Sequence, residues 1–124
     1  MINVKHFMDP IEPTDGNRIW VEPIGVTKDL IEWCQITHTL CNIAPPQVLC
    51  DWLELHPDGY DYFQAQYHEL LDKSHFKPGL EHLACEARRE EITLLHQSSN
   101  PRQNSATALY EFLIDLEAYC SPDQ

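Results

Sequence analysis

Basic residues are scarce in this chain of 124 residues, which has 8 lysines and arginines against 20 aspartates and glutamates. The resulting formal charge of −12 repels the phosphate backbone of nucleic acids at long range. We therefore expect no sequence-independent binding of DNA or RNA, although a small basic pocket can exist within an acidic whole.

Long hydrophobic runs are also missing. The longest are only a few residues, whereas a transmembrane helix needs about 20. The start of the chain, MINVKHFMDP, has neither the basic region nor the apolar stretch of a secretory leader. These features predict a cytoplasmic protein with no membrane partner.

The remaining composition is that of an ordinary globular domain, with 43% hydrophobic and 23% charged residues. No internal repeat and no low-complexity linker divides the chain, so residues 1–124 are expected to form a single domain. Five cysteines are an odd number without a secretory context, and we expect free thiols in a reducing compartment.

Hydrophobic patterns predict few strands and several helices. The strands are expected at residues 2–7, 18–22 and 92–96, the last of them apolar enough to be covered on both faces. The helices are expected at 27–34, 44–56, 60–73, from Pro78 onwards and at 104–119. Helices that cross over between strands favour an α/β fold with a small, mostly parallel sheet of three to four strands and about five helices, Rossmann-like and helix-rich.

Two stretches carry a family resemblance: VKHFMDPIEPTDGNRIWVE near the start and ITLLHQSSNPRQNSATALYEFL near the end. They resemble the YeaO-like branch of the domain of unknown function 488 family, and the similarity covers about residues 2–116. The most specific pieces are DGNRIWVE and the strand–loop–helix TLLH…QNSATAL. The resemblance implies a small α/β domain and no particular activity. No helix-turn-helix is recognisable, and the charge has the wrong sign for a DNA-binding regulator.

The chain departs from the family pattern at two places. Only EPIGVTKDL follows the second predicted strand, where the family has a longer stretch with arginines and a tryptophan. Asn104–Ser105 stand where the family often has Asn-His. Three polar residues of this chain match positions that are usually polar in the family: Arg18, Glu22 and Asn104. The resemblance implies that these residues belong to a site. The stretch CQITHTLC (34–41) has no counterpart in the YeaO-like pattern, so it resembles an insertion relative to that pattern.

The first candidate site is the loop that follows the strand at 92–96. In open α/β sheets, ligands bind beyond the carboxyl ends of the strands, and His96 ends this strand. The loop supplies Arg102 and Gln103, and the helix that begins after Asn104 offers free backbone N–H groups to an anion such as a phosphate ester. The loop has no glycine, so it is not a Walker-type cradle. The simpler alternative is that Asn104 caps the helix and the rest is a solvated turn.

Arg18, Trp20 and Glu22 share one face of the strand at 18–22. If this strand lies beside the strand at 92–96, Glu22 and His96 can meet as a general acid–base pair. The site would then bind a small molecule, with or without catalysis. The alternative is an Arg18–Glu22 ion pair on a partly exposed strand.

Four thiol and imidazole side chains form the metal alternative: Cys34, His38, Cys41 and Cys50. They are suitable zinc ligands, but Cys34 and Cys41 are separated by six residues, whereas zinc knuckles usually separate their cysteines by two to four. Free cysteines usually serve as small buried hydrophobic residues.

The last hypothesis is a non-catalytic interaction module. Six carboxylates lie between residues 51 and 72, and they could meet a basic partner, although a solvated helical face is the simpler interpretation. The sequence indicates no particular cofactor, reaction or oligomeric state.

Overall fold

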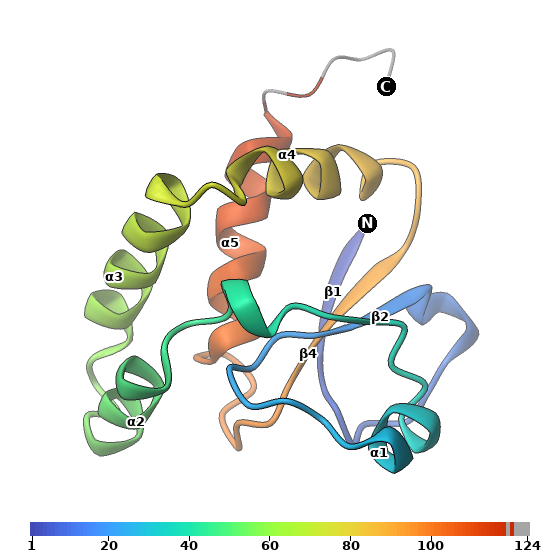
Figure 1. The fold of residues 1–124 in the computed structure, drawn as a ribbon, viewed down its shortest axis with the longest axis horizontal. Helices are drawn as coiled ribbons and strands as arrows, with labels where there is room; N and C mark the ends of the chain where they lie inside the picture. Colours follow the sequence, from blue (N-terminus) through green and yellow to red (C-terminus); the bar gives the residue numbers. More distant parts are fainter. Residues whose placement is uncertain (119, 121–124) are drawn as a thin grey trace.

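A parallel sheet of four strands forms the centre of the domain in the computed structural model, which describes residues 1–118 and 120 (Figure 1). The strands are β1 (Ile2–His6), β2 (Asn17–Trp20), β3 (His38–Thr39) and β4 (Ile92–His96). Their order is β1-β4-β2-β3, and every neighbouring pair is parallel. The predicted α/β class with a small parallel sheet is therefore confirmed.

Within residues 1–118, five helices connect and cover the strands. They are α1 (Lys28–Trp33), α2 (Gln47–Leu55), α3 (Tyr60–Lys73), α4 (Lys77–Glu86) and α5 (Ser105–Glu117). Short 3-10 turns lie at Pro13–Asp15 and Cys41–Ile43. Two helices begin at the caps that the sequence predicts: Thr27 Oγ1 accepts from Leu30 N at 3.2 Å, and Asn104 Oδ1 accepts from Thr107 N at 2.8 Å. None of the helices within the described residues is long and apolar enough to cross a bilayer.

The core is divided by the sheet, with β4 at its centre. Ile92 and Leu94 belong to the larger cluster, which contains the inner faces of α3, α4 and α5. Leu95 points to the opposite face, where it packs with Trp20 and the segment that includes α1. Every residue of β4 is buried, so the prediction that this strand is covered on both faces is confirmed.

Strand bounds differ from the prediction at the second strand. β2 ends at Trp20 rather than at residue 22, although Val21 N still donates to Leu95 O at 3.0 Å. The fourth strand, β3, lies inside CQITHTLC and pairs Ile19 with His38. A strand of two exposed residues has no hydrophobic alternation, so periodicity could not reveal it.

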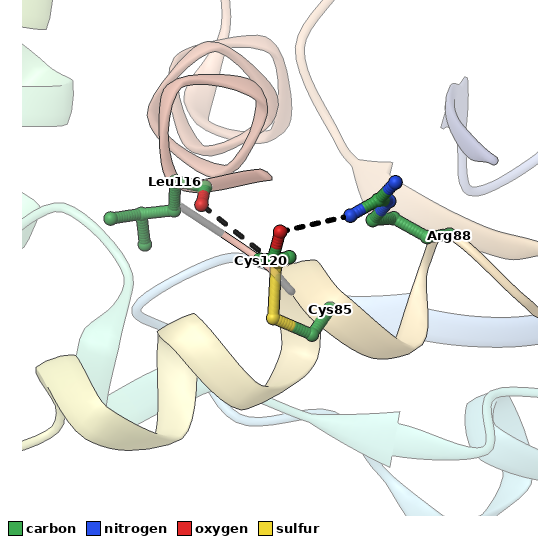
Figure 2. Close-up of a disulfide and its surroundings, with 4 residues drawn as sticks. All are labelled: Cys85, Arg88, Leu116 and Cys120. Atoms are coloured by element: carbon green, nitrogen blue, oxygen red, sulfur yellow. Dashed lines mark hydrogen bonds between the residues drawn. A yellow bond between two sulfur atoms is a disulfide. The ribbon is translucent and has the colours of Figure 1, made fainter. Parts of the chain in front are cut away.

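The prediction of five free thiols was wrong for two of them. Cys85 on α4 forms a disulfide with Cys120, which follows α5 (Figure 2). Arg88 Nη1 also donates to the Cys120 carbonyl oxygen at 3.2 Å. The two cysteines are 35 residues apart in sequence, and the packing of α4 against α5 brings them together. The other three cysteines are free.

Candidate functional site

A hollow of about 740 Å³ opens at the carboxyl edge of the sheet. β2 and β4 are parallel neighbours, so the segments that follow them emerge side by side, as the sequence predicted. These segments form the wall together with α2 and the start of α5. Its polar side chains are Glu22, Gln47, Cys50, Asp51, Glu54, Gln97, Ser98, Ser99, Asn100, Gln103, Asn104 and Ser105. This edge of an α/β sheet is where ligands generally bind.

Glu22 is the buried carboxylate of the hollow. Gln97 Nε2 donates to Glu22 Oε2 at 3.2 Å, and the Ser105 side chain is a second hydrogen-bond partner. Burial raises the pKa of Glu22, and the nearby Glu54 adds to this, while the hydrogen bonds oppose it. A proton or a cationic ligand would therefore relieve the cost of burying this charge.

The first turn of α5 meets Glu22 inside the hollow. Asn104 caps the helix, and its Nδ2 donates to Asn100 O at 2.9 Å. Ser105, the first helical residue, brings its side chain to Glu22. A carboxylate of the protein itself thus lies beside the positive end of the helix, where the sequence predicted an exogenous anion.

Cys50 projects from α2 towards the same place. Its Sγ lies 3.8 Å from Ser105 Oγ and 3.7 Å from the Pro45 carbonyl oxygen. Burial raises the pKa of the Cys50 thiol to about 11, and Ser105 opposes this while Glu22 reinforces it. The thiol is consequently protonated near neutral pH, which makes it a poor nucleophile.

His96 is buried at the end of β4, and it does not line the hollow. Its Nδ1 accepts from Ser98 N at 3.2 Å, which leaves the proton of the neutral ring on Nε2. The His6 ring packs edge-on against it, with centroids 5.5 Å apart. Burial lowers the pKa of His96 to about 4, and the charge of His6 contributes to this. The structure gives His96 and Glu22 separate partners rather than the predicted mutual contact.

Arg18 also lies away from the hollow, on the α1 side of the sheet. Its Nη1 is 2.5 Å from Asp15 Oδ2, and its Nε donates to Cys34 O at 2.8 Å. Asp15 additionally pairs with Lys5 at 3.0 Å. Burial alone would raise the pKa of Asp15, but the hydrogen bonds from Glu12 N, Lys5 and Arg18 lower it overall. Arg18 therefore joins β2 to the preceding turn and forms no ion pair with Glu22.

The loop residues of the predicted site separate into two groups. Gln103 and Asn104 line the hollow. Arg102 is exposed and does not line it, and its backbone N–H donates to Asn100 Oδ1 at 3.0 Å. The hollow therefore contains no guanidinium from Arg102 that could bind an anion, although the sequence had predicted one there.

The four proposed zinc ligands do not converge. Cys34 is buried against Trp20, Cys41 Sγ faces the Ile24 carbonyl oxygen at 3.7 Å, and Cys50 lies at the hollow. Across residues 1–118 and 120, no three His, Cys, Asp or Glu side chains are placed to hold a metal ion. The zinc alternative had grouped these side chains by their distance along the sequence, and the fold places them apart.

Sequence reasoning missed three contributors to the hollow: Gln97, Cys50 and Ser105. Gln97 directly follows His96, and because neighbouring side chains of a strand alternate between its faces, it was the better candidate to approach Glu22. Ser105 was named from the sequence only because it stands where the resembling family often has the histidine of an Asn-His pair. Cys50 was assigned to the zinc group, and no local pattern places it beside α5.

Comparison with known proteins identifies the family. A family model described as "Inactive DUF488-N3 subclade" matches residues 1–121. The "Uncharacterized protein YeaO" of Escherichia coli is 32% identical over 123 residues, which cover 93% of this chain and 98% of YeaO.

Mycobacterial relatives are similar over a shorter region. Uncharacterized proteins of Mycobacterium bovis and Mycobacterium tuberculosis are 30% identical over 79 residues, or 59% of this chain. The match spans 62% of the length of these relatives. No solved structure matches. The family model and YeaO together show that this chain belongs to the domain of unknown function 488 family, within the subclade described as inactive.

Proposed function

We propose that the domain binds a small polar ligand in the hollow at the carboxyl edge of its sheet, without catalysing a reaction. The acidity of the hollow is the observation that carries this proposal. Glu22, Asp51 and Glu54 line it, and no lysine or arginine is among its lining residues. This lining favours a cationic amine, or a neutral molecule that donates hydrogen bonds, over the anion that the sequence predicted.

Three features support binding without catalysis. The Cys50 thiol is held in its protonated form, and His96 is buried with its Nδ1 already bonded to the backbone. Ser105, the first residue of α5, carries a hydroxyl that does not titrate near neutral pH, so it supplies no acid or base there. The description of the subclade as inactive agrees with these features.

An NMR titration tests the ligand class. Agmatine and glucosamine, added to ¹⁵N-labelled protein, are expected to shift the amide signals of Gln97, Asn100 and Ser105, and glucose 6-phosphate is not. Glu54→Gln should weaken amine binding because it removes an exposed carboxylate from the rim. Glu81→Gln on α4 is the matched control, since it removes an exposed carboxylate outside the hollow. Binding of the phosphate ester but not of the amines would contradict the proposal.

A second candidate function is a non-catalytic interaction module with a basic protein partner. The surface of α2 and α3 favours it, because apolar side chains are exposed there among carboxylates. A partner held in this way should dissociate as ionic strength rises. Binding that is indifferent to salt would argue against this candidate.

The cytoplasmic location stays a prediction, and the disulfide provides its test. Structural disulfides are rare in reducing compartments. Alkylation of Cys85 and Cys120 immediately after cell lysis, read by mass spectrometry, reports whether the bond exists in the cell. Free thiols at both positions would agree with a reducing cytoplasm, and a bonded pair would argue for an oxidising compartment.

A further inference from the structure

A second cavity, of about 540 Å³, lies between α4 and the β2–β3 edge of the sheet, and it is called the α4 groove below. Its floor is apolar: Ile19 and Leu80 are buried, and Leu40, Ile43 and Leu83 are partly buried. A cavity of this size with a mostly apolar lining is typical of sites for small molecules. The α4 groove shares no lining residue with the hollow at the carboxyl edge of the sheet.

The α4 groove changes from apolar to acidic along the helix. Phe76, Leu80, Leu83 and Glu86 follow one another at spacings of four, three and three residues, so they lie on one side of α4. This side is apolar where the helix begins and acidic where it ends. Glu90, just beyond the helix, adds a second carboxylate to the lining. The carboxyl end of a helix is also the negative end of its dipole, so a positive charge is favoured at this end of the groove.

The acidic end of the α4 groove includes a carboxylate that is not used within the domain. His82 Nε2 lies 3.0 Å from Glu86 Oε1, whereas the Glu90 carboxylate has no hydrogen-bond or ion-pair partner among the residues that the structure describes. The Met1 ammonium donates to the Ala87 and Glu90 carbonyl oxygens and not to either carboxylate. None of the lysines and arginines in the described part of the chain lines the groove. An ammonium group of a ligand therefore finds an unpaired carboxylate there.

Gly79 leaves the α4 groove open on the helix side. It is the third residue of α4, and glycine is the least favourable residue in a helix apart from proline. The backbone does not require glycine here, because its φ is not positive. The packing does not require it either, since a Cβ added at this position meets no atom within 4 Å. The effect of the missing side chain is open space in the groove beside Leu80 and Leu83.

We propose that the α4 groove binds a small molecule with a flat apolar body and an ammonium group, such as an aromatic amine. The apolar body lies over Leu80 and Leu83, where Gly79 leaves room for it. The ammonium group faces the Glu90 carboxylate. The site is separate from the hollow at the carboxyl edge, and its ligand needs a flat apolar body, which agmatine lacks.

An NMR titration with tryptamine tests the site, and indole-3-propionate is the matched anion with the same ring. Tryptamine should shift the amide signals of Thr39, Leu40 and Leu83 in ¹⁵N-labelled protein, and indole-3-propionate should bind at least tenfold more weakly. Gly79→Leu should weaken tryptamine binding at least tenfold, because the new side chain occupies the groove. This variant should melt no lower than the native protein, since leucine favours a helix and the position has free space.

Two charge variants test the acidic end. Glu90→Gln should weaken tryptamine binding about 1.5- to 5-fold, as expected when an exposed ion pair is lost. Glu81→Gln is the matched control, because Glu81 is an exposed carboxylate of α4 outside the groove, and it should leave the affinity unchanged. Equal effects of the two variants would overturn the place of the ammonium group.

The outcomes separate the α4 groove from the hollow. Unchanged tryptamine affinity in the folded Gly79→Leu variant would overturn the proposal, and so would equal binding of tryptamine and indole-3-propionate. Tryptamine binding that is weakened by Glu54→Gln but not by Gly79→Leu would show that the amine binds in the hollow instead. Gly79→Leu should leave the amide shifts that agmatine causes at the hollow unchanged, so failure of one site is recorded separately from failure of the other.

Discussion

Breaking the disulfide between Cys85 and Cys120 should destabilise the domain substantially. The bond closes a loop of 35 residues, and it ties the segment after α5 to α4 (Figure 2). The chain-entropy model gives about 3–4 kcal/mol for a loop of this length. For a domain of this size, that loss corresponds to a fall of about 10–15 °C in Tm.

Thermal melts of four proteins measure this effect. The native protein is melted with and without dithiothreitol, beside Cys85→Ser and the Cys85→Ser/Cys120→Ser double variant. We expect the reduced native protein and both variants to melt at the same lowered temperature, because each lacks the same bond. Dithiothreitol should not change the variants further. Cys41→Ser, which alters a free cysteine, is the control and should melt within about 2 °C of the native protein.

Two results would refute this reasoning. If reduction left Tm unchanged, the bond would not constrain the unfolded chain as the entropy model requires. If the double variant were much less stable than Cys85→Ser alone, the cysteines would contribute separately through packing rather than through a shared bond.

Three further predictions concern titratable groups. Burial raises the pKa of Glu22, so the folded state binds its proton more tightly than the unfolded chain. The stability that Glu22 contributes is then greatest below the unfolded pKa of about 4.3, and it is lost as pH rises through the folded pKa. Glu22→Gln should remove this loss of stability in thermal melts between pH 4 and 7. An unchanged pH profile in the variant would contradict the prediction. The pH dependence that His96 contributes has the opposite sign, because burial lowers its pKa to about 4. Its contribution to the free energy of unfolding is complete above pH 6.5, and about 3 kcal/mol of it is lost as pH falls towards 4. His96→Gln should flatten this acid limb in urea titrations, and a limb of undiminished slope would refute the assignment. At pH 8, iodoacetamide should modify Cys50 at least about 100-fold more slowly than free cysteine, because its pKa is about 11; rapid labelling in peptide mapping would show an accessible thiolate.

The parts of the fold that depend on periodic burial could be predicted from the sequence. β4 was expected at residues 92–96 and lies there, because four consecutive apolar or small polar residues, followed by His96, fit a strand covered on both faces. α3 spans Tyr60–Lys73 as expected, since its apolar residues recur at helical spacing. The caps Thr27 and Asn104 were predicted from side chains whose oxygen atoms satisfy local N–H groups.

The candidate site was only partly predictable. The parallel pairing of β2 and β4, and the approach of Glu22 to the start of α5, follow from rules for α/β sheets. The position of Arg18 does not follow from these rules. Its partner, Asp15, lies in a turn that no periodic pattern in the sequence predicts. The Cys85–Cys120 disulfide was missed because it depends on how two helices pack, which cysteine counting cannot resolve.

The proposed function depends on a binding site for a cationic or neutral polar ligand at the ends of β2 and β4. A crystal structure of the protein soaked in agmatine tests it most directly. We expect a positively charged nitrogen of agmatine within hydrogen-bonding distance of the Glu22 or Glu54 carboxylate, inside the hollow beside α2. An empty hollow at saturating agmatine, or a phosphate bound there in its place, would contradict the account.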